Sequence, residues 1–128
     1  MQIDFLSLED VLVIHADQIS RYGGADGVRA QHLLLSAIAQ PSSTFDGQYL
    51  HATMFDKAAA YLFHICQNHP FVDGNKRTAL ATTLQFLSMN DHLIIDYDES
   101  ALEHLTLSVA SGKIRKDKIA SFLAQDGR

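Results

Sequence analysis

The residues whose types and order suggest chemistry lie in one uninterrupted segment, residues 69–77, which reads HPFVDGNKR. It carries an imidazole at His69, a carboxylate at Asp73 and two cations at Lys76 and Arg77. A neutral imidazole can take the proton of an attacking hydroxyl, and paired cations at the start of a helix can hold an oxyanion. The segment therefore predicts a site that binds phosphate and activates a hydroxyl, with His69 as the general base.

The other residues of this segment are expected to shape it into a tight turn between two helices. Pro70 disfavours helical geometry at the residue before it, so we expect His69 to be extended, with its ring projecting from the end of the preceding helix. Gly74 permits backbone angles that other residues resist. Asn75 is expected to be the N-cap of the following helix, which leaves the first N–H groups of that helix pointing outward beside the two cations. Because cations there oppose the helix dipole, the arrangement favours anion binding over stability.

Asp73 is the single acid of the segment, and its role has three interpretations. Its carboxylate can hold a Mg²⁺ ion that bridges phosphate oxygens, it can orient His69, or it can serve as a turn or N-cap residue. We take His69, Asp73 and Arg77 as the candidate catalytic residues and Asp73 as the candidate metal ligand. The candidate nucleotide-binding residues are Gly74, Asn75, Lys76 and Arg77.

Other reactive side chains have simpler interpretations. His64 lies near His69 in the sequence, but neither a His-Glu-x-x-His motif nor a Cys/His cluster accompanies it, so a structural zinc is not expected. Cys66 lies among apolar residues in a predicted helix and is expected to be a small buried side chain rather than a nucleophile. Arg29 can reach the site or pair with an acid. A basic cluster is either a solvated helix face or a contact for a partner or nucleic acid; it comprises Lys113, Arg115, Lys116 and Lys118.

The elements that must position these residues are predicted to be helical, because apolar residues recur at helical spacing along most of the chain. The two helices that flank residues 69–74 are apolar on nearly every side, so both should be buried. Residues 41–52 form a long irregular loop of the kind that is often functional, and residues 92–97 form a short strand or a buried connector. Helices are expected between a Ser7–Asp10 capping box and Gly23, and over residues 28–40, 54–68, 75–90, 99–111 and 115–125.

Composition limits the class of protein. With 128 residues, the chain has room for a single domain, 1–128, and its 47% apolar and 20% charged residues are typical of a soluble globular protein. One cysteine cannot form an internal disulfide, so a reducing cytoplasm is expected, and no apolar run is long enough for a membrane span. The net charge of −5 argues against broad, phosphate-driven DNA binding. The glycine motifs of P-loop and Rossmann sites are both missing from the sequence.

Residues 69–77 resemble the Fic family motif, H-P-F-x-[D/E]-G-N-[G/K]-R, at each of its specified positions. Lys76 and the Thr-Ala-Leu of residues 78–80 resemble the Doc (death-on-curing) branch, because the adenylylating branch usually has glycine at position 76 and a second arginine at position 80. Weaker similarities extend over most of the chain. Two departures are Ala30 and Leu35, which stand where Doc-like chains often have acids.

The resemblance implies a compact, all-α Fic/Doc-type bundle of about six helices, in which residues 41–52 form a flap that binds a protein target. It implies a toxin of a toxin–antitoxin pair that transfers a phosphate from ATP, with Mg²⁺, to a serine or threonine hydroxyl of a translation factor, elongation factor Tu. Protein synthesis then stops. By position, His69 would be the general base, Asp73 would hold Mg²⁺, and residues 74–77 would grip the phosphates.

The partner implied by the resemblance is an antitoxin protein, whose helical C-terminal segment would lie in an apolar groove on the toxin. DNA would be contacted only indirectly, through the antitoxin, and no membrane is involved. Two alternatives remain open. One is a Fic-type protein adenylyltransferase, and the other is a non-catalytic, antitoxin-binding module that acts as a co-repressor at its own promoter.

Overall fold

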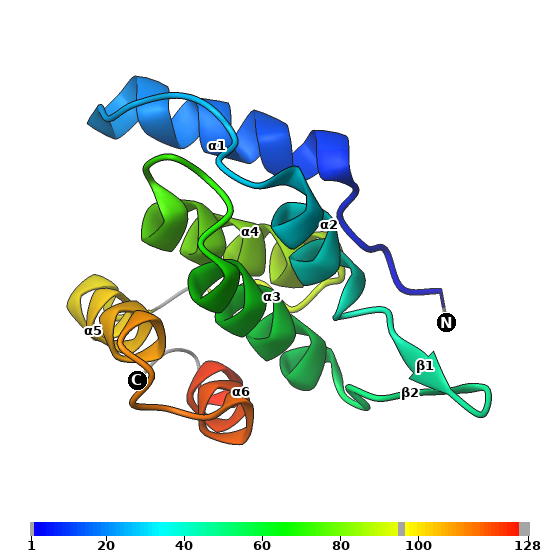
Figure 1. Ribbon diagram of the computed structural model, residues 1–128. Helices are drawn as coiled ribbons and strands as arrows, with labels where there is room; N and C mark the ends of the chain where they lie inside the picture. Colours follow the sequence, from blue (N-terminus) through cyan, green and yellow to red (C-terminus); the bar gives the residue numbers. More distant parts are fainter. Residues whose placement is uncertain (1, 95–96, 126–128) are drawn as a thin grey trace.

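The computed structural model describes residues 2–94 and 97–125. Within these residues the chain forms six helices and one small hairpin (Figure 1), which confirms the predicted all-α class. No described helix is long and apolar enough to cross a membrane. The elements in chain order are α1 (Leu8–Tyr22), α2 (Gln31–Ala39), β1 (Thr44–Phe45), β2 (Gln48–Tyr49), α3 (Met54–Asn68), α4 (Asn75–Met89), α5 (Glu99–Ala110) and α6 (Lys116–Ala124).

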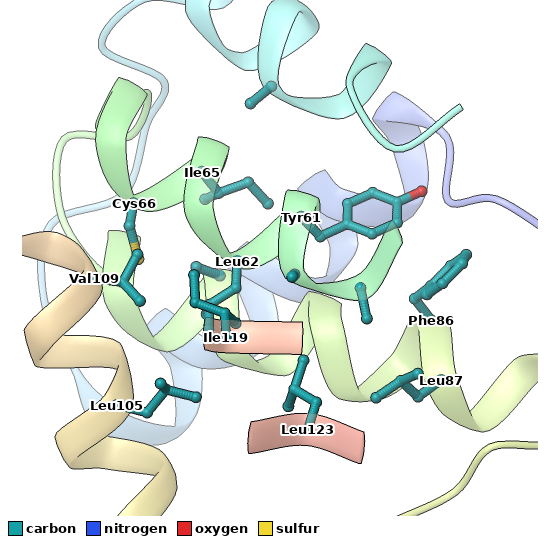
Figure 2. Close-up of a cluster of buried hydrophobic side chains, with 14 of the residues drawn as sticks. Tyr61, Leu62, Ile65, Cys66, Phe86, Leu87, Leu105, Val109, Ile119 and Leu123 are labelled. Carbon is teal, nitrogen blue, oxygen red and sulfur yellow. The ribbon is translucent and has the colours of Figure 1, made fainter. Parts of the chain in front are cut away.

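Helix α3 is the centre of the fold and packs against α2, α4, α5 and α6. Tyr61, Leu62 and Ile65 on α3 are fully buried. Figure 2 shows these side chains among apolar side chains from α4, α5 and α6. The predicted burial of this helix is therefore confirmed, and its C-terminal end carries the segment at residues 69–77 out of the core.

Helix α4 is buried on one face, whereas its sequence predicts burial nearly all round. Ala79, Phe86 and Leu87 are fully buried, but Leu80 and Leu84 are only half-buried. The half-buried face is the floor of a hollow of about 570 Å³, whose walls come from α1 and α5. We call this hollow the α4 groove.

Helix α1 begins where the sequence predicts. The Ser7 hydroxyl accepts a hydrogen bond from the Asp10 backbone N–H, and the Asp10 carboxylate accepts one from the Ser7 N–H, which completes the capping box. The helix ends at Gly23, which has a φ of 83° and donates its N–H to the carbonyl of Ile19. Both ends therefore follow from local sequence.

Helix α2 begins at Gln31, not at Val28 as its apolar pattern predicts. The residues before it pair with the turn between α3 and α4 instead of winding into a helix. Val28 forms an antiparallel bridge with Phe71, and the N–H groups of Arg29 and Ala30 both donate to the carbonyl of Pro70. This backbone pairing, which no local pattern signals, fastens the residue 69–77 segment to the start of α2.

The loop at residues 41–52 contains the hairpin of β1 and β2, which projects away from the helices in Figure 1. The strands pair Thr44 with Tyr49 in antiparallel register. Asp46 and Gly47 connect them with φ angles of 54° and 79°, as a tight hairpin turn requires. We call residues 41–52 the flap. Of the predicted strand or connector at residues 92–97, residues 92–94 form no strand, while residues 95–96 lie outside the described residues.

Candidate active site

His69 ends α3 in an unexpected conformation. The sequence predicts extended geometry, but His69 has a φ of 49° and a ψ of 54°, in the left-handed region. Proline disfavours the right-handed helical region at the preceding residue, and here His69 adopts the left-handed region instead of an extended conformation. The His69 N–H still donates to the Ile65 carbonyl. The side chain is exposed, so the ring projects from the end of α3 as expected although the backbone differs.

Asn75 is not the N-cap of α4; Gly74 has that position, with a φ of 76° that suits glycine. Asn75 is the first helical residue and is buried. Its Oδ1 accepts from the Phe71 N–H at 2.8 Å, and its Nδ2 donates to the Phe71 carbonyl at 2.9 Å. The same Nδ2 lies 3.2 Å from His69 Nε2. Because an amide nitrogen only donates, the contact favours the tautomer of His69 with an unprotonated Nε2.

A cleft of about 140 Å³ opens at the N-terminus of α4. This terminus has no side-chain cap, so the first N–H groups of the helix remain available to a ligand. Lys76 is exposed and Arg77 is half-buried at the rim. The cleft unites every candidate site residue predicted from the sequence; its lining consists of His69, Val72, Asp73, Gly74, Asn75, Lys76 and Arg77.

Asp73 carries an exposed carboxylate that backbone N–H groups hold in place. Its Oδ1 accepts from the Gly74 N–H at 2.8 Å, and its Oδ2 accepts from the Ala25 N–H at 3.2 Å. The hydrogen bonds from Ala25 and Gly74 lower the pKa of Asp73, and the charge of Arg77 acts in the same direction. The group is therefore ionised at neutral pH, and each oxygen keeps a lone pair for another partner.

This carboxylate fits a Mg²⁺ ion as one ligand of several. The described residues contain no group of three or more acids, histidines or cysteines that would hold a metal by themselves. Mg²⁺ is commonly held by one or two carboxylates, with water and substrate phosphates completing its shell. Asp73, which lines the cleft together with Lys76 and Arg77, suits that mode of binding.

The Arg77 guanidinium is held by Gly23 and Tyr22 and also lines the cleft. Its Nη2 donates to the Gly23 carbonyl at 3.0 Å, and its guanidinium carbon lies 5.7 Å from the centroid of the Tyr22 ring. Among the described residues, the bond to Gly23 is the one hydrogen bond that the guanidinium makes. A guanidinium has five N–H donors, so Arg77 retains donors for an oxyanion in the cleft.

His15 is a site residue that the sequence does not single out, since it lies in the inward stripe of α1. It is only 3% exposed, and its ring stacks on Phe71 with 3.9 Å between centroids and an interplanar angle of 5°. Its Nε2 lies 2.8 Å from the carbonyl oxygen of Asp73. The only sequence signal is a polar residue at a core position. His15 thus supports the turn that carries Asp73.

Arg29 reaches the backbone of the site, and no acid pairs with it in the described part of the chain. Its Nε donates to the His69 carbonyl at 2.8 Å and its Nη2 to the Asn68 carbonyl at 3.0 Å. A cation that binds the last carbonyls of a helix is favoured by the helix dipole. Arg29 therefore fixes the end of α3, and with it the backbone of His69.

The two remaining sequence candidates lie away from the cleft. Cys66 is 5% exposed, and burial raises the pKa of its thiol to about 12, which excludes a reactive thiolate at neutral pH. His64 belongs to no group of three or more potential metal ligands among the described residues. Its partner is Lys116, whose Nζ lies 3.0 Å from His64 Nε2.

The fold and cleft together define a class: a helical protein whose central helix presents a histidine beside the uncapped N-terminus of the next helix. Residues 5–87 match the sequence model of the Fic/DOC family, and the chain belongs to this family. It is similar to Toxin Doc of Mycolicibacterium smegmatis, with 41% identity over 122 residues, 94% of this chain and 92% of that protein. It is also similar to Protein kinase doc of Escherichia phage P1, with 32% identity over 118 residues, 92% of this chain and 91% of that protein.

Proposed function

We propose that the protein is a Doc toxin that transfers the γ-phosphate of ATP to a serine or threonine hydroxyl of elongation factor Tu. The observation that carries this proposal is the position of His69 on the same cleft as the open N-terminus of α4. Two similar proteins, named a Doc toxin and a doc protein kinase, support the toxin and kinase parts of this proposal. The cleft offers a proton acceptor and an oxyanion site side by side.

His69 acts as the general base of the reaction. Its unprotonated Nε2, facing the Asn75 amide at 3.2 Å, takes the proton of the acceptor hydroxyl as that oxygen attacks the γ-phosphorus. The bond between the γ-phosphorus and the β–γ bridging oxygen breaks, ADP leaves with that oxygen, and the proton remains on the imidazole. Release of the proton to water restores the base.

The N-terminus of α4 binds the phosphates. Its N–H groups and the positive end of its dipole attract negative oxygens. Lys76 adds a point charge, and Arg77 adds a planar donor that can bind two oxygens at once. Asp73 would hold Mg²⁺, which neutralises phosphate charge when bound.

The direction of transfer distinguishes this proposal from adenylylation. Purified protein is incubated with elongation factor Tu, Mg²⁺ and ATP labelled at either the α- or the γ-phosphate. We expect label on the acceptor from γ-labelled ATP only. Label from the α-position would establish an adenylyltransferase, and label from neither would contradict catalysis on this target.

His69→Ala tests whether toxicity requires the base. Loss of a general base costs about 10²–10⁴ in rate, so we expect the variant to lose growth inhibition in cells without the antitoxin. Val72→Ala is the matched control, because Val72 is an exposed residue of the same cleft. Full growth inhibition by His69→Ala would favour the non-catalytic co-repressor module.

We further propose that the antitoxin segment binds in the α4 groove. Leu80 and Leu84 form part of its floor, Leu102 and Glu103 belong to its α5 side, and Arg77 belongs both to this groove and to the cleft. A helix with apolar and basic side chains would complement the leucines and Glu103 of this groove, and a helix bound there would lie against Arg77. Leu84→Glu should abolish antitoxin binding while phosphate transfer persists; unchanged binding would contradict this location.

A further inference from the structure

Two lysines hold the C-terminal part of the flap. Lys57 is 1% exposed, and its Nζ donates to the carbonyls of His51 and Ala52 at 2.7 and 3.0 Å. The same Nζ lies 4.2 Å from the centroid of the Tyr49 ring, in β2. In the described part of the chain, no carboxylate lies within salt-bridge distance of this ammonium. The Lys57 ammonium is thus stabilised by flap carbonyls and an aromatic face.

Lys116, at the start of α6, makes the second attachment. Its Nζ lies 3.1 Å from Nε2 of His51 in the flap and 3.0 Å from Nε2 of His64 in α3. An ammonium only donates, so both Nε2 atoms accept and each neutral ring carries its proton on Nδ1. We call Lys116, His51 and His64 the flap junction. It connects the flap, α3 and α6 at a single nitrogen.

The surroundings of the flap junction favour this uncharged state of the rings. Burial and the charge of Lys116 lower the pKa of His64 to about 4. The same two causes lower the pKa of His51, although the backbone of Gln40 and the charge of Asp56 act in the opposite direction. Burial also lowers the pKa of Lys116 itself. Among the described residues no carboxylate pairs with Lys116, and the two imidazole lone pairs fix the position of its ammonium.

We propose that Lys116 is a positioning residue for substrate binding, which acts through His51 to hold the flap in the orientation that presents β1 and β2 to the acceptor protein. This inference rests on the proposed function, because it assigns the flap to the protein substrate. It makes α6, which is far from residues 69–77 in the sequence, part of the substrate-binding apparatus. The flap supports that use, since Phe45 is 75% exposed and Leu50 is 61% exposed.

The first test measures the flap itself and needs no activity. Lys116→Met keeps the aliphatic stem and removes the ammonium. We expect the Leu50 amide, which donates to the Ser43 carbonyl, to exchange with solvent about ten times faster in the variant. Lys118→Met is the control, because Lys118 is an exposed lysine of the same helix. Equal exchange in wild type and Lys116→Met would overturn the proposal.

Two substitutions at His51 test whether the effect of Lys116→Met comes from the lost hydrogen bond or from general damage to α6. Glutamine presents an oxygen near the position of Nε2 and can accept from Lys116, whereas leucine cannot. We expect His51→Gln to keep wild-type exchange at Leu50 and His51→Leu to match Lys116→Met. Identical exchange in the two His51 variants would contradict the role of the lone pair.

Kinetics separate this inference from the proposed function. We expect Lys116→Met to raise the KM for elongation factor Tu about tenfold and to leave the KM for ATP unchanged. An increase in the KM for ATP with no change for the protein substrate would overturn the inference. If wild type transfers no phosphate to this factor, the proposed function fails, whereas the exchange measurements still decide whether the junction holds the flap.

Discussion

Asn75 Nδ2 lies 3.2 Å from His69 Nε2, and the same Asn75 side chain exchanges two hydrogen bonds with the backbone of Phe71. One buried amide therefore sets both the shape of the turn and the tautomer of the base. At 3.2 Å the contact is at the upper end of the hydrogen-bond range, so an acceptor hydroxyl can replace it at modest cost. This relationship links the stability of the turn to its chemistry.

Asn75→Asp should separate these two roles. A carboxylate can still accept from the Phe71 N–H, but it faces His69 with an acceptor and favours the protonated ring. We expect the phosphate-transfer rate at pH 7 to fall at least about tenfold and the pH–rate profile to move to higher pH. Asn68→Asp is the control, because it loses a comparable amide donor, to the Leu33 carbonyl, without contacting the ring. An unshifted profile would show that Asn75 does not govern the base.

Arg77→Ala should weaken nucleotide binding and spare the fold. The variant loses a charged donor at the cleft, which corresponds to about a 10- to 100-fold weaker Kd for ATP by calorimetry. The hydrogen bond to the Gly23 carbonyl is exposed, so the unfolding free energy should change by less than about 1 kcal/mol. Arg21→Ala, which removes an exposed arginine paired with Asp17, serves as the control. A large loss of thermal stability would instead make Arg77 a structural residue.

Gly24→Ala should displace the carboxylate of Asp73. A Cβ at this position would lie 2.7 Å from Asp73 Oδ2 and 3.3 Å from Arg77 Nη2, and Gly24 has a φ of 114°. We expect Mg²⁺ to strengthen ATP binding less in the variant than in wild type. Gly112→Ala also places alanine at a positive φ, 76°, but in open space. If both variants respond to Mg²⁺ like wild type, Asp73 is not a ligand of the metal.

The pKa of His64 predicts a pH dependence of stability. This pKa falls from the ordinary histidine value of 6.5 to about 4 in the folded chain. Between those values the unfolded state binds a proton that the folded state does not, so the unfolding free energy decreases as pH falls through this window and levels off below it. Chemical denaturation from pH 7 to 4 measures this slope.

His64→Gln provides the comparison for that slope. Glutamine can accept from Lys116 but does not titrate. The unfolding free energy of the variant should therefore change less between pH 6.5 and 4 than that of wild type. The pKa of Asp10 is lowered from 3.8 by hydrogen bonds from Ser7, so its titration lies below this window. Parallel curves for wild type and variant would contradict the low pKa of His64.

Local sequence is enough to predict the helices, because each depends on periodicity and on neighbouring caps. The capping box of Ser7 and Asp10 and the bounds of α3 follow from residues within a few positions of each other. The same reasoning brings the candidate site residues to one turn, since they all lie between residues 69 and 77. It fails at Val28, where pairing with Phe71 replaces the first turn of the expected helix.

Several features of the site instead depend on contacts between residues far apart in the chain. Arg29 meets the end of α3, His15 meets the Asp73 carbonyl, and Lys116 meets His51 across 65 residues. The sequence around a histidine or lysine looks the same whether the side chain is solvated or hydrogen-bonded, so neighbouring residues do not identify its partner. The residue types from 69 to 77 specify the chemistry that is available, and the packing of α1, α2 and α6 against this frame specifies how those groups are held.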